Sequence, residues 1–382
     1  MKPIKVMSVF GTRPEAVKMA PLALELAKDN RFESMVCVTA QHRQMLDGVL
    51  SCFGISPDFD LDIMQAGQTL TDITSRVLSG LGEILKREQP NLVLVHGDTT
   101  TTFSGALAAF YEKIPVGHVE AGLRTYDRYS PFPEEMNRRL TGQIAEYHFA
   151  PTAKNAENLR NEGIRDNIFI TGNTVIDAMS YTVGDGSLSI PSLSGVDFGS
   201  KRIITLTCHR RENYGKPMEG IFSAVRRLAL GHMEDIEIVF PVHMSPYVRE
   251  TASRILGDVQ NIRLIEPLGT VEMHRLMKKS LFIMTDSGGI QEEAPALGRP
   301  VIVLRRETER PEAIEAGTAA LAGTEEEAVL QLAERLLTDR ALYDKMACAV
   351  NPYGDGRACP RIAQAILYGF GLCESGPEDF KP

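Results

Sequence analysis

One stretch of this sequence, between Leu281 and Gly317, restricts the possible folds more than any other. It begins with the apolar run LFIMT, breaks at DSGG, continues with the helically spaced IQEEAPAL and ends on a second apolar run, RPVIVL. A strand-length apolar run followed by a turn, a helix and another such run is typical of a βαβ module. The stretch therefore predicts two parallel strands joined by a helix.

The turn inside this module has the composition of an anion site. Ser287, Gly288 and Gly289 stand where the strand ends and the helix begins, and adjacent glycines allow a close approach to the backbone. Unpaired first-turn N–H groups and the positive end of the helix dipole favour an anion there. A tight turn without a ligand is the alternative interpretation.

Charged residues near the turn favour the ligand. Glu292 and Glu293 lie in the first helical turns, where a carboxylate could accept hydrogen bonds from sugar hydroxyls. Arg305, Arg306 and Arg310 cluster beyond the second strand, and guanidinium groups suit phosphate. A nucleotide diphosphate would use the turn, the carboxylates and the arginines together.

The same alternation of strands and helices occurs along the whole chain. Residues 4–10 have the pattern of a strand that leads into a turn and a helix, and residues 92–119 repeat this scheme. Residues 183–200 are rich in Gly and Ser and lack periodicity, which predicts a linker or a surface loop next to it. We therefore expect an α/β protein with two Rossmann-like domains and parallel sheets, residues 1–175 and 176–363.

The C-terminal region has a different character. Residues 324–370 show helical spacing, and a Gly-rich turn, NPYGDG, interrupts them. The tail that follows, ESGPEDFKP, is polar, which predicts a frayed end.

Length and composition exclude several classes of protein. The 382 residues exceed one ordinary core, and 43% hydrophobic with 24% charged residues are values of a globular protein. A net charge of -9 argues against general nucleic-acid binding. The sequence has neither an 18-residue apolar run nor the pattern of a signal peptide. The six cysteines show no CxxC spacing, so we expect reduced thiols in a cytoplasmic protein that does not bind membranes.

Polar residues gather at the predicted ends of strands, where open α/β sheets bind ligands. Asp98 and Glu120 both follow strands, and two carboxylates at one edge suggest acid–base chemistry. The full set is Arg13, Asp98, Glu120, His209, Arg210, His243, Asp286 and Ser287.

Several of these charged residues have a structural alternative. Glu134 and Glu135 occupy the first turn of a predicted helix, where a carboxylate stabilises the helix through its dipole by about 0.5 kcal/mol. Arg13 and Lys18 flank a helix start and could simply be solvated. His209 lies among cations, so it should be neutral or donate to a diphosphate.

We expect neither a metal nor a dinucleotide cofactor. HxxxH spacing is absent, and His118, Asp98 and Glu120 would form a metal site only by a coincidence of the fold. The GxGxxG fingerprint and the GxSxG elbow are also absent.

Eight motifs occur in an order that resembles a known family. They are GTRPEAVKMAPL, VHGDTTTT, GHVEAGLRT, SPFPEEMNRRLTG, TGNTVIDA, TCHRREN, TDSGGIQEEAPALGRPVIVLRRETERPEA and NPYGDG. This series, from Gly11 to Ile366, is similar to that of the non-hydrolysing UDP-N-acetylglucosamine 2-epimerases. The resemblance implies a GT-B-like fold, with two Rossmann-like domains and parallel sheets facing a central cleft. It further implies that a C-terminal helix, residues 364–382, crosses back to the first domain, and that the protein is a homodimer.

The resemblance also implies an activity. The family interconverts UDP-GlcNAc and UDP-ManNAc without NAD or a catalytic metal, through removal of the C2 proton and elimination of UDP to 2-acetamidoglucal. UDP then adds back with protonation of C2 on the other face, and the product supplies ManNAc for surface polysaccharides.

Site residues follow from the same motifs. Asp98, Glu120 and Glu134 match the family's acid–base carboxylates, with their separate roles unassigned. The departing diphosphate would be stabilised by several groups, and Glu293 would bind the ribose. The groups on the diphosphate side are Arg13, Lys18, His209, Arg310 and the backbone of Ser287, Gly288 and Gly289.

Some members of the family bind a second UDP-GlcNAc as an activator. Gln41, Gln44 and His243 resemble residues of that site, whereas Gly67 stands where some members carry an arginine. Three other functions compete with the reversible epimerase: a hydrolysing 2-epimerase that releases UDP and ManNAc, a GT-B glycosyltransferase, and a nucleotide-sugar sensor. Three carboxylates near a diphosphate argue against the sensor.

Overall fold

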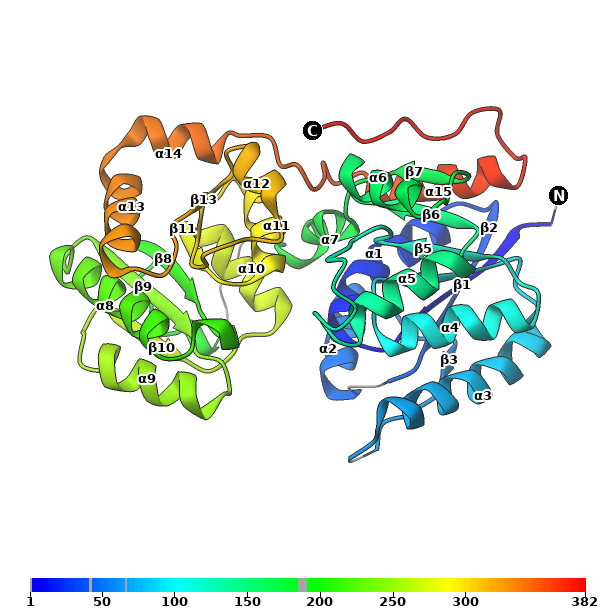
Figure 1. Cartoon of the computed structure of the whole chain (residues 1–382), viewed down its shortest axis with the longest axis horizontal. Coiled ribbons are helices and arrows are strands. Elements are labelled where there is room, and N and C mark those ends of the chain that lie inside the picture. The colour runs from blue at the N-terminus through cyan, green and yellow to red at the C-terminus, as the bar shows by residue number, and fades with distance from the viewer. Residues whose placement is uncertain (1, 41–42, 66, 185–190) are drawn as a thin grey trace. The chain divides into compact units, whose positions relative to one another are not determined.

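The computed structural model describes residues 2–40, 43–65, 67–184 and 191–382. The chain forms two compact units (Figure 1). Unit 1 comprises Met1–Tyr181 and Tyr353–Lys381, and unit 2 comprises Thr182–Pro352 with Pro382.

Unit 1 is built on a parallel sheet of seven strands. Their order is β3-β2-β1-β4-β5-β6-β7, so the direction of strand addition reverses between β1 and β4. The strands are β1 (Ile4–Phe10), β2 (Phe32–Val38), β3 (Phe59–Asp60), β4 (Leu92–His96), β5 (Val116–Val119), β6 (Tyr147–Ala150) and β7 (Ile168–Ile170). The helices are α1 (Arg13–Lys28), α2 (Arg43–Phe53), α3 (Leu70–Glu88), α4 (Thr100–Tyr111), α5 (Glu134–Ile144), α6 (Ala153–Asn161), α7 (Thr174–Thr182) and α15 (Ala358–Gly369).

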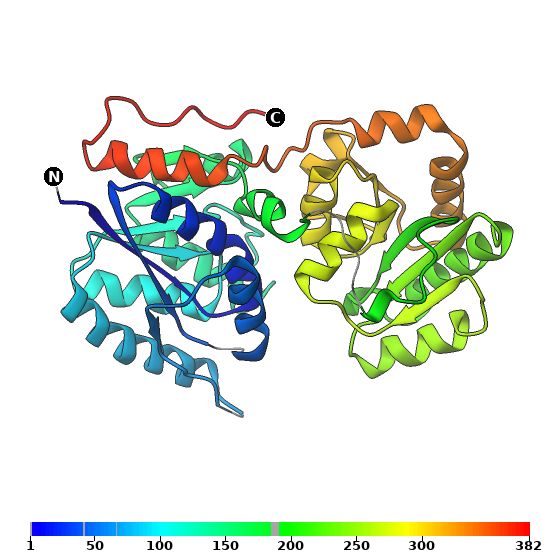
Figure 2. The same cartoon turned by 180° about the vertical axis from the view of Figure 1, so that it is seen from behind.

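Helices cover both faces of the unit 1 sheet. Crossovers between parallel strands are right-handed, so the reversal of strand order places α1 and α2 on one face and α4 and α5 on the other. Helix α15 returns to pack against α1 (Figure 2). On the other face, α3 begins with a capping box of Thr69 and Asp72 and buries Leu81 and Leu85 against the sheet.

Unit 2 repeats this architecture with six parallel strands. Their order is β10-β9-β8-β11-β12-β13, which reverses between β8 and β11. The strands are β8 (Arg202–Thr207), β9 (Ile236–Pro241), β10 (Ile262–Ile265), β11 (Ser280–Thr285), β12 (Val301–Val303) and β13 (Ala319–Leu321). The helices are α8 (Lys216–Gly231), α9 (Pro246–Leu256), α10 (Thr270–Lys279), α11 (Gly288–Ala296), α12 (Pro311–Glu315), α13 (Glu326–Thr338) and α14 (Arg340–Ala347), with short 3-10 turns η1 (Pro191–Leu193) and η2 (Arg211–Asn213).

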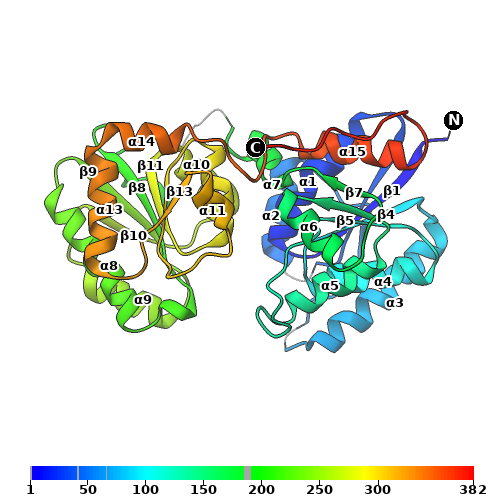
Figure 3. The same ribbon diagram turned by 45° about the horizontal axis from the view of Figure 1, so that its top comes forward.

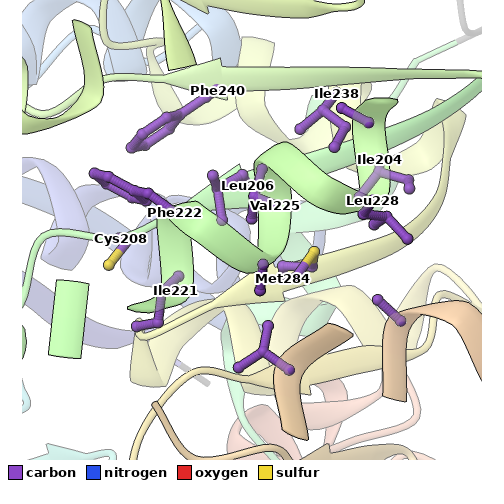
Figure 4. Packing of buried hydrophobic residues seen from close by; sticks show 14 of the residues in the cluster. Ile204, Leu206, Cys208, Ile221, Phe222, Val225, Leu228, Ile238, Phe240 and Met284 are labelled. Atoms are coloured by element: carbon purple, nitrogen blue, oxygen red, sulfur yellow. The ribbon is translucent and has the colours of Figure 1, made fainter. Parts of the chain in front are cut away.

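The main core of unit 2 lies between the sheet and α8, which packs beside α9 and α13 (Figure 3). Phe222 of α8 meets Phe240 of β9 edge to face, with 5.5 Å between ring centroids (Figure 4). Leu206 and Met284 come from the two strands at the reversal and belong to the same fully buried cluster. Burial of such side chains contributes about 1.5–3 kcal/mol each, so these two strands and their following loops are held firmly.

The C-terminal region corrects two expectations. The last helix is α15, Ala358–Gly369, rather than residues 364–382, because Gly369 and Gly371, the latter with φ of +70°, end it. The tail beyond it is not frayed: Phe380 is 4% exposed, and its N–H donates to Ile170 O at 2.7 Å. An aromatic side chain and an edge strand therefore anchor a segment whose composition is polar.

The division into units differs in detail from the expected boundaries. Unit 1 extends to Tyr181, through nearly all of α7, and resumes at Tyr353. Of the predicted linker, residues 185–190 lie outside the described part of the chain. Beyond them, Leu193 is 3% exposed and packs in a small core with Ile203 and Leu276. In the residues described, no helix is both long and apolar enough to cross a membrane.

Candidate active site

Each sheet carries its predicted polar residues at the point where the strand order reverses. In unit 1 the reversal lies between β1 and β4, which lead into Arg13 and Asp98. In unit 2 it lies between β8 and β11, which lead into His209 and Ser287. Crevices at such reversals bind the ligands of open α/β sheets. Each unit therefore has one candidate half-site at the carboxyl edge of its sheet.

A buried carboxylate joins the two loops of the unit 1 half-site. Glu15 accepts the backbone N–H groups of Gly11 at 3.0 Å and Thr12 at 2.7 Å, and the hydroxyls of Thr99 at 2.6 Å and Thr102 at 3.1 Å. Burial raises the pKa of Glu15, and these hydrogen bonds oppose the rise. Four donors on one carboxylate fix the loop after β1 to the loop after β4.

Among the candidate carboxylates of unit 1, Glu120 is both held by hydrogen bonds and accessible. It directly follows β5 with φ of +63°, a left-handed conformation that costs about 1–3 kcal/mol for residues other than glycine and is concentrated at functional sites. Its Oε2 accepts hydrogen bonds from Lys18 Nζ and from Asn173 Nδ2, the latter at 3.0 Å. The side chain is 15% exposed, so it is held in place and remains accessible.

Two buried histidines lie on β4 and β5, the strands that end at this edge of the sheet. His96 Nε2 is 3.7 Å from Glu120 Oε2, and neither ring nitrogen of His96 has a hydrogen-bond partner among the described residues. Burial lowers the pKa of His96 to about 4 and that of His118 to about 3. His118 Nε2 lies 2.7 Å from Gly97 O. Both rings are therefore neutral near pH 7. In the described part of the chain, no group of three His, Cys, Asp or Glu side chains could hold a metal ion.

The remaining carboxylates of unit 1 separate into distinct environments. Asp98 Oδ2 accepts from Arg138 Nε at 2.9 Å and Nη2 at 2.7 Å. Glu135 is fully buried and accepts the backbone N–H groups of Thr125 and Tyr126 at 3.0 and 3.1 Å, so it has the structural role. Glu134 Oε2 is buried without a partner in the described part of the chain. Of the adjacent pair, Glu134 is thus the one available for chemistry.

Asp286 organises the half-site of unit 2. This fully buried carboxylate accepts, through Oδ2, the backbone N–H groups of His209 and Arg210 at 2.8 Å each and Asn213 Nδ2 at 3.1 Å. Its Oδ1 lies 3.4 Å from His209 Nδ1. The pKa of His209 is lowered by burial and by the charges of His243 and Arg210, and Asp286 opposes this shift.

Two guanidinium groups flank the first turn of α11. A side-chain carbon placed on Gly288 would lie 3.9 Å from Arg210 Nη2 and 3.9 Å from Arg310 Cζ. The helix begins there with Ser287 as its N-cap, and the Ser287 side chain does not cap the helix N–H groups. The combination of a helix N-terminus, a glycine and two arginines suits an anion.

The glutamate pair of α11 points in two directions. Glu292 is 3% exposed and binds Arg310 Nε, which overturns its expected role as an acceptor for sugar hydroxyls because its carboxylate is committed inside the protein. Glu293 Oε2 lies 3.3 Å from His274 Nε2, and His274 Nδ1 lies 2.7 Å from Thr182 Oγ1. Glu293 is 17% exposed and remains the candidate for ribose binding.

The expected arginine cluster is dispersed. Arg305 is buried and pairs with Glu212 at 2.5 Å and Glu309 at 3.3 Å. Arg306 is 75% exposed and faces Glu325. Of these three side chains, Arg310 is therefore the one that flanks the first turn of α11.

The predicted activator residues are only partly described. Gln41 lies outside the described residues, and of Gln44 the structure describes the helical backbone of α2 but not the side chain. His243 is exposed and stacks on His209 with 5.2 Å between ring centroids. Its Nδ1 accepts the backbone N–H of Ser245 at 3.1 Å.

Comparison with known proteins identifies the family. The sequence profile of UDP-N-acetylglucosamine 2-epimerase matches residues 24–367. The UDP-N-acetylglucosamine 2-epimerase of Bacillus subtilis is 58% identical over 381 residues, which are 100% of this chain and 99% of the relative. The chain belongs to the UDP-N-acetylglucosamine 2-epimerase family.

Solved structures agree with this assignment. The UDP-GlcNAc 2-epimerase of Neisseria meningitidis, crystallised with UDP-GlcNAc, is 48% identical over 95% of this chain and 100% of its own, with a TM-score of 0.85. The glycotransferase of kitacinnamycin shares the fold alone, with 11% identity and a TM-score of 0.62 over 96% of this chain and 100% of its own. This member of the 2-epimerase family therefore has a GT-B-like fold of two Rossmann-like units.

Several site residues of this family member escape sequence reasoning. Glu15 stands in the GTRPEA motif, at the start of a predicted helix, where acidic residues are common because of the helix dipole alone. Asn173 and Arg138 contact Glu120 and Asp98 from 53 and 40 residues away in the sequence. The GNT and NRR motifs around them are the only local signals, and neither specifies a partner.

Proposed function

We propose that this protein interconverts UDP-GlcNAc and UDP-ManNAc by reversible epimerisation at C2 without hydrolysing the nucleotide sugar. The observation that carries the proposal is Glu120, a partly exposed carboxylate at the sheet edge whose Oε2 is held by Lys18 and Asn173. Family membership and a relative crystallised with UDP-GlcNAc support the choice of substrate.

The proposed reaction is an elimination followed by an addition. A carboxylate removes the C2 proton, the C1–O bond to UDP breaks, and the two carbons form the double bond of 2-acetamidoglucal. UDP then adds to C1 while an acid protonates C2 on the opposite face. Because a C2 proton is weakly acidic, the base must be held within hydrogen-bond reach.

The carboxylates of unit 1 are our candidates for these proton transfers. Glu120 is held but accessible, Asp98 is paired with Arg138, and Glu134 has one oxygen without a partner among the described residues. Different environments for neighbouring acids are what separate acid and base roles in one site. Their individual roles remain unassigned in this proposal.

Unit 2 would bind the nucleotide and stabilise the departing diphosphate. Arg210, Arg310 and the first N–H groups of α11 supply positive potential where charge develops. His209, oriented by Asp286, would donate to a phosphate oxygen. Glu293 would accept a hydrogen bond from the ribose, and Arg13 and Lys18 would bind the diphosphate from unit 1.

The remaining parts of the proposal concern assembly and regulation. We propose a homodimer, whose mass light scattering would measure, and a supply of ManNAc to surface polysaccharides. We also propose that Gln41, Gln44 and His243 bind a second UDP-GlcNAc as an activator. The contact of His243 with His209 supports such coupling, and a lag with UDP-ManNAc alone, removed by UDP-GlcNAc, would test it.

The decisive experiment incubates the protein with UDP-GlcNAc in deuterated water, without NAD or added metal, and follows C2 by NMR. Deuterium at C2 with UDP-ManNAc approaching an equilibrium mixture is the expected result. Free ManNAc accumulating in step with UDP would instead identify a hydrolysing enzyme. An untouched C2 would contradict epimerisation and favour a glycosyltransferase that requires an acceptor.

A further inference from the structure

The Asn173 side chain is held so that its amide group faces Glu120. Asn173 Oδ1 accepts the backbone N–H of Val175 at 3.1 Å, so Asn173 caps the N-terminus of α7. An N–H group requires an acceptor, which leaves the donor Nδ2 on the other side of the amide, 3.0 Å from Glu120 Oε2. The cap therefore fixes the orientation of the hydrogen bond to Glu120.

The backbone around Asn173 is fixed by the returning C-terminal region. The Asn173 N–H donates to Tyr353 O at 2.7 Å. A side-chain carbon on Gly172, whose φ is +83°, would lie 3.3 Å from Gly354 Cα and 3.7 Å from Phe380 Cγ. Two separate parts of the C-terminal region therefore pack directly against the segment that carries Asn173.

The tail itself is anchored to the edge strand that leads into this segment. The Phe380 N–H donates to Ile170 O at 2.7 Å, and Asp379 Oδ1 accepts the Ile170 N–H at 3.2 Å. Arg361 lies over the Phe380 ring, 5.5 Å from its centroid, and donates to Thr171 O at 3.2 Å. After α15 the tail turns back along unit 1 (Figure 2) and satisfies β7 backbone groups that an edge strand leaves unpaired.

Phe380 also belongs to the small core beneath Glu120. It is 4% exposed and clusters with Ala121, the residue that follows Glu120, and with Ile170. The tail is thus linked to Glu120 in two ways. Phe380 packs with Ala121, the neighbour of Glu120, and the tail also holds the segment of Asn173, which donates to the Glu120 carboxylate.

We propose that Asn173 is a positioning residue for Glu120 and that the tail residues Asp379 and Phe380 hold Asn173 in place. The inference rests on the proposed function, because it takes Glu120 as a proton-transfer group. Glu120 performs its task only when its carboxylate is held at a fixed orientation, and a misplacement of about 1 Å can cost on the order of a hundredfold in rate.

Two substitutions at Asn173 separate positioning from helix capping. Ser and Asp cap helices about as well as Asn, so neither Asn173→Ser nor Asn173→Asp removes the cap of α7. Serine removes the donor to Glu120, and aspartate places a second carboxylate against it. Both variants should lower kcat at least about tenfold with KM for UDP-GlcNAc changed less than about threefold, the signature of an interaction that matters in the transition state. Parent values of kcat in both would overturn the inference.

Truncation tests the tail. A chain that ends at Glu378 loses Asp379 and Phe380, whereas a control that ends at Phe380 loses only the exposed Lys381 and Pro382. The first should lower kcat about as much as Asn173→Ser, and the control should keep the parent rate. Because interacting sites are non-additive, truncation at Glu378 should cost less than about threefold more in an Asn173→Ser background. If the truncation lowers kcat by the same factor in the Asn173→Ser protein as in the parent, the tail does not act through Asn173. That result would overturn this half of the inference.

Glu120→Gln distinguishes a failure of the inference from a failure of the proposed function. An inactive Glu120→Gln protein beside a fully active Asn173→Ser protein would overturn the inference and leave the function standing. Parent C2 deuterium exchange in Glu120→Gln would overturn the inference, because Glu120 would then transfer no proton, and would leave the epimerisation standing. An untouched C2 with the parent protein would overturn the proposed function itself.

Discussion

The carboxylate of Asp286 holds His209 at two points. Oδ2 accepts the backbone N–H of His209 at 2.8 Å, and Oδ1 lies 3.4 Å from its Nδ1. A carboxylate next to Nδ1 favours a proton on that nitrogen and fixes the orientation of the ring, as in other histidines oriented by a buried acid. The Nε2 atom is then the part of His209 that can meet a ligand.

Replacement of Asp286 should therefore weaken the unit 2 half-site. Asp286→Asn keeps one acceptor oxygen for the loop but removes the charge that opposes the lowering of the His209 pKa. Hydrogen bonds to charged groups contribute about 1.5–3 kcal/mol, so kcat/KM for UDP-GlcNAc should fall by roughly 10- to 100-fold. Asp258→Asn, a 68% exposed partner of Arg226 in the same unit, is the matched control. Equal kinetics for the two variants would contradict the assignment.

Glu15 should matter for stability more than its place in a first helical turn suggests. Glu15→Gln cannot accept all four hydrogen bonds of the parent, and an unsatisfied buried donor costs about 1–3 kcal/mol. Urea denaturation should therefore show a loss of that size. Glu25→Gln, on the same helix with a partly exposed side chain, should change the free energy of unfolding by less than about 0.5 kcal/mol. If Glu15→Gln also lowered the free energy of unfolding by less than about 0.5 kcal/mol, the loops after β1 and β4 would hold their positions without the Glu15 carboxylate.

The fold was predictable because its signals are local. The run LFIMT became β11 and the break DSGG became the start of α11, since strand length, glycine and helical spacing act within a few residues. The directions of the side chains were not predicted correctly. Glu292 and Glu293 are adjacent in the sequence, yet a helix turns by about 100° per residue, so one faces Arg310 and the other His274.

Long-range partners could not be predicted for a related reason. The contact between Asn173 and Glu120 depends on how β5 and the segment after β7 lie at one sheet edge, and the burial of Phe380 depends on the return of α15 to unit 1. No short pattern encodes either relationship. A polar tail composition predicted fraying because it cannot show that a single aromatic residue has a core to enter.

Buried histidines should make the protein sensitive to mild acid. Burial lowers the pKa of His148 from 6.5 to about 4. Above pH 6.5 the His148 ring is neutral in both the folded and the unfolded protein. Between pH 6.5 and 4 the ring binds a proton in the unfolded chain but not in the folded one. The free energy of unfolding therefore falls as pH falls through this window, by up to about 1.4 kcal/mol per pH unit for each such histidine. Urea titrations of parent and His148→Phe at several pH values should show a slope reduced by about that amount, and an unchanged slope would contradict a neutral buried ring.

The glycine at the start of α11 offers a test of the anion site that leaves the fold intact. A methyl group on Gly288 would meet Arg210 and Arg310 at 3.9 Å, an ordinary contact distance, so Gly288→Ala should unfold at nearly the parent urea concentration. The same methyl group fills the space between the guanidinium groups where we place the diphosphate, so calorimetry should show UDP binding at least about tenfold weaker, which corresponds to about 1.4 kcal/mol. Gly82→Ala is the control, because a methyl group there meets nothing within 4 Å and alanine suits the interior of α3 better than glycine. If Gly288→Ala binds UDP as tightly as the control, the diphosphate does not lie on this helix terminus, and the roles of Arg210 and Arg310 must be reassigned.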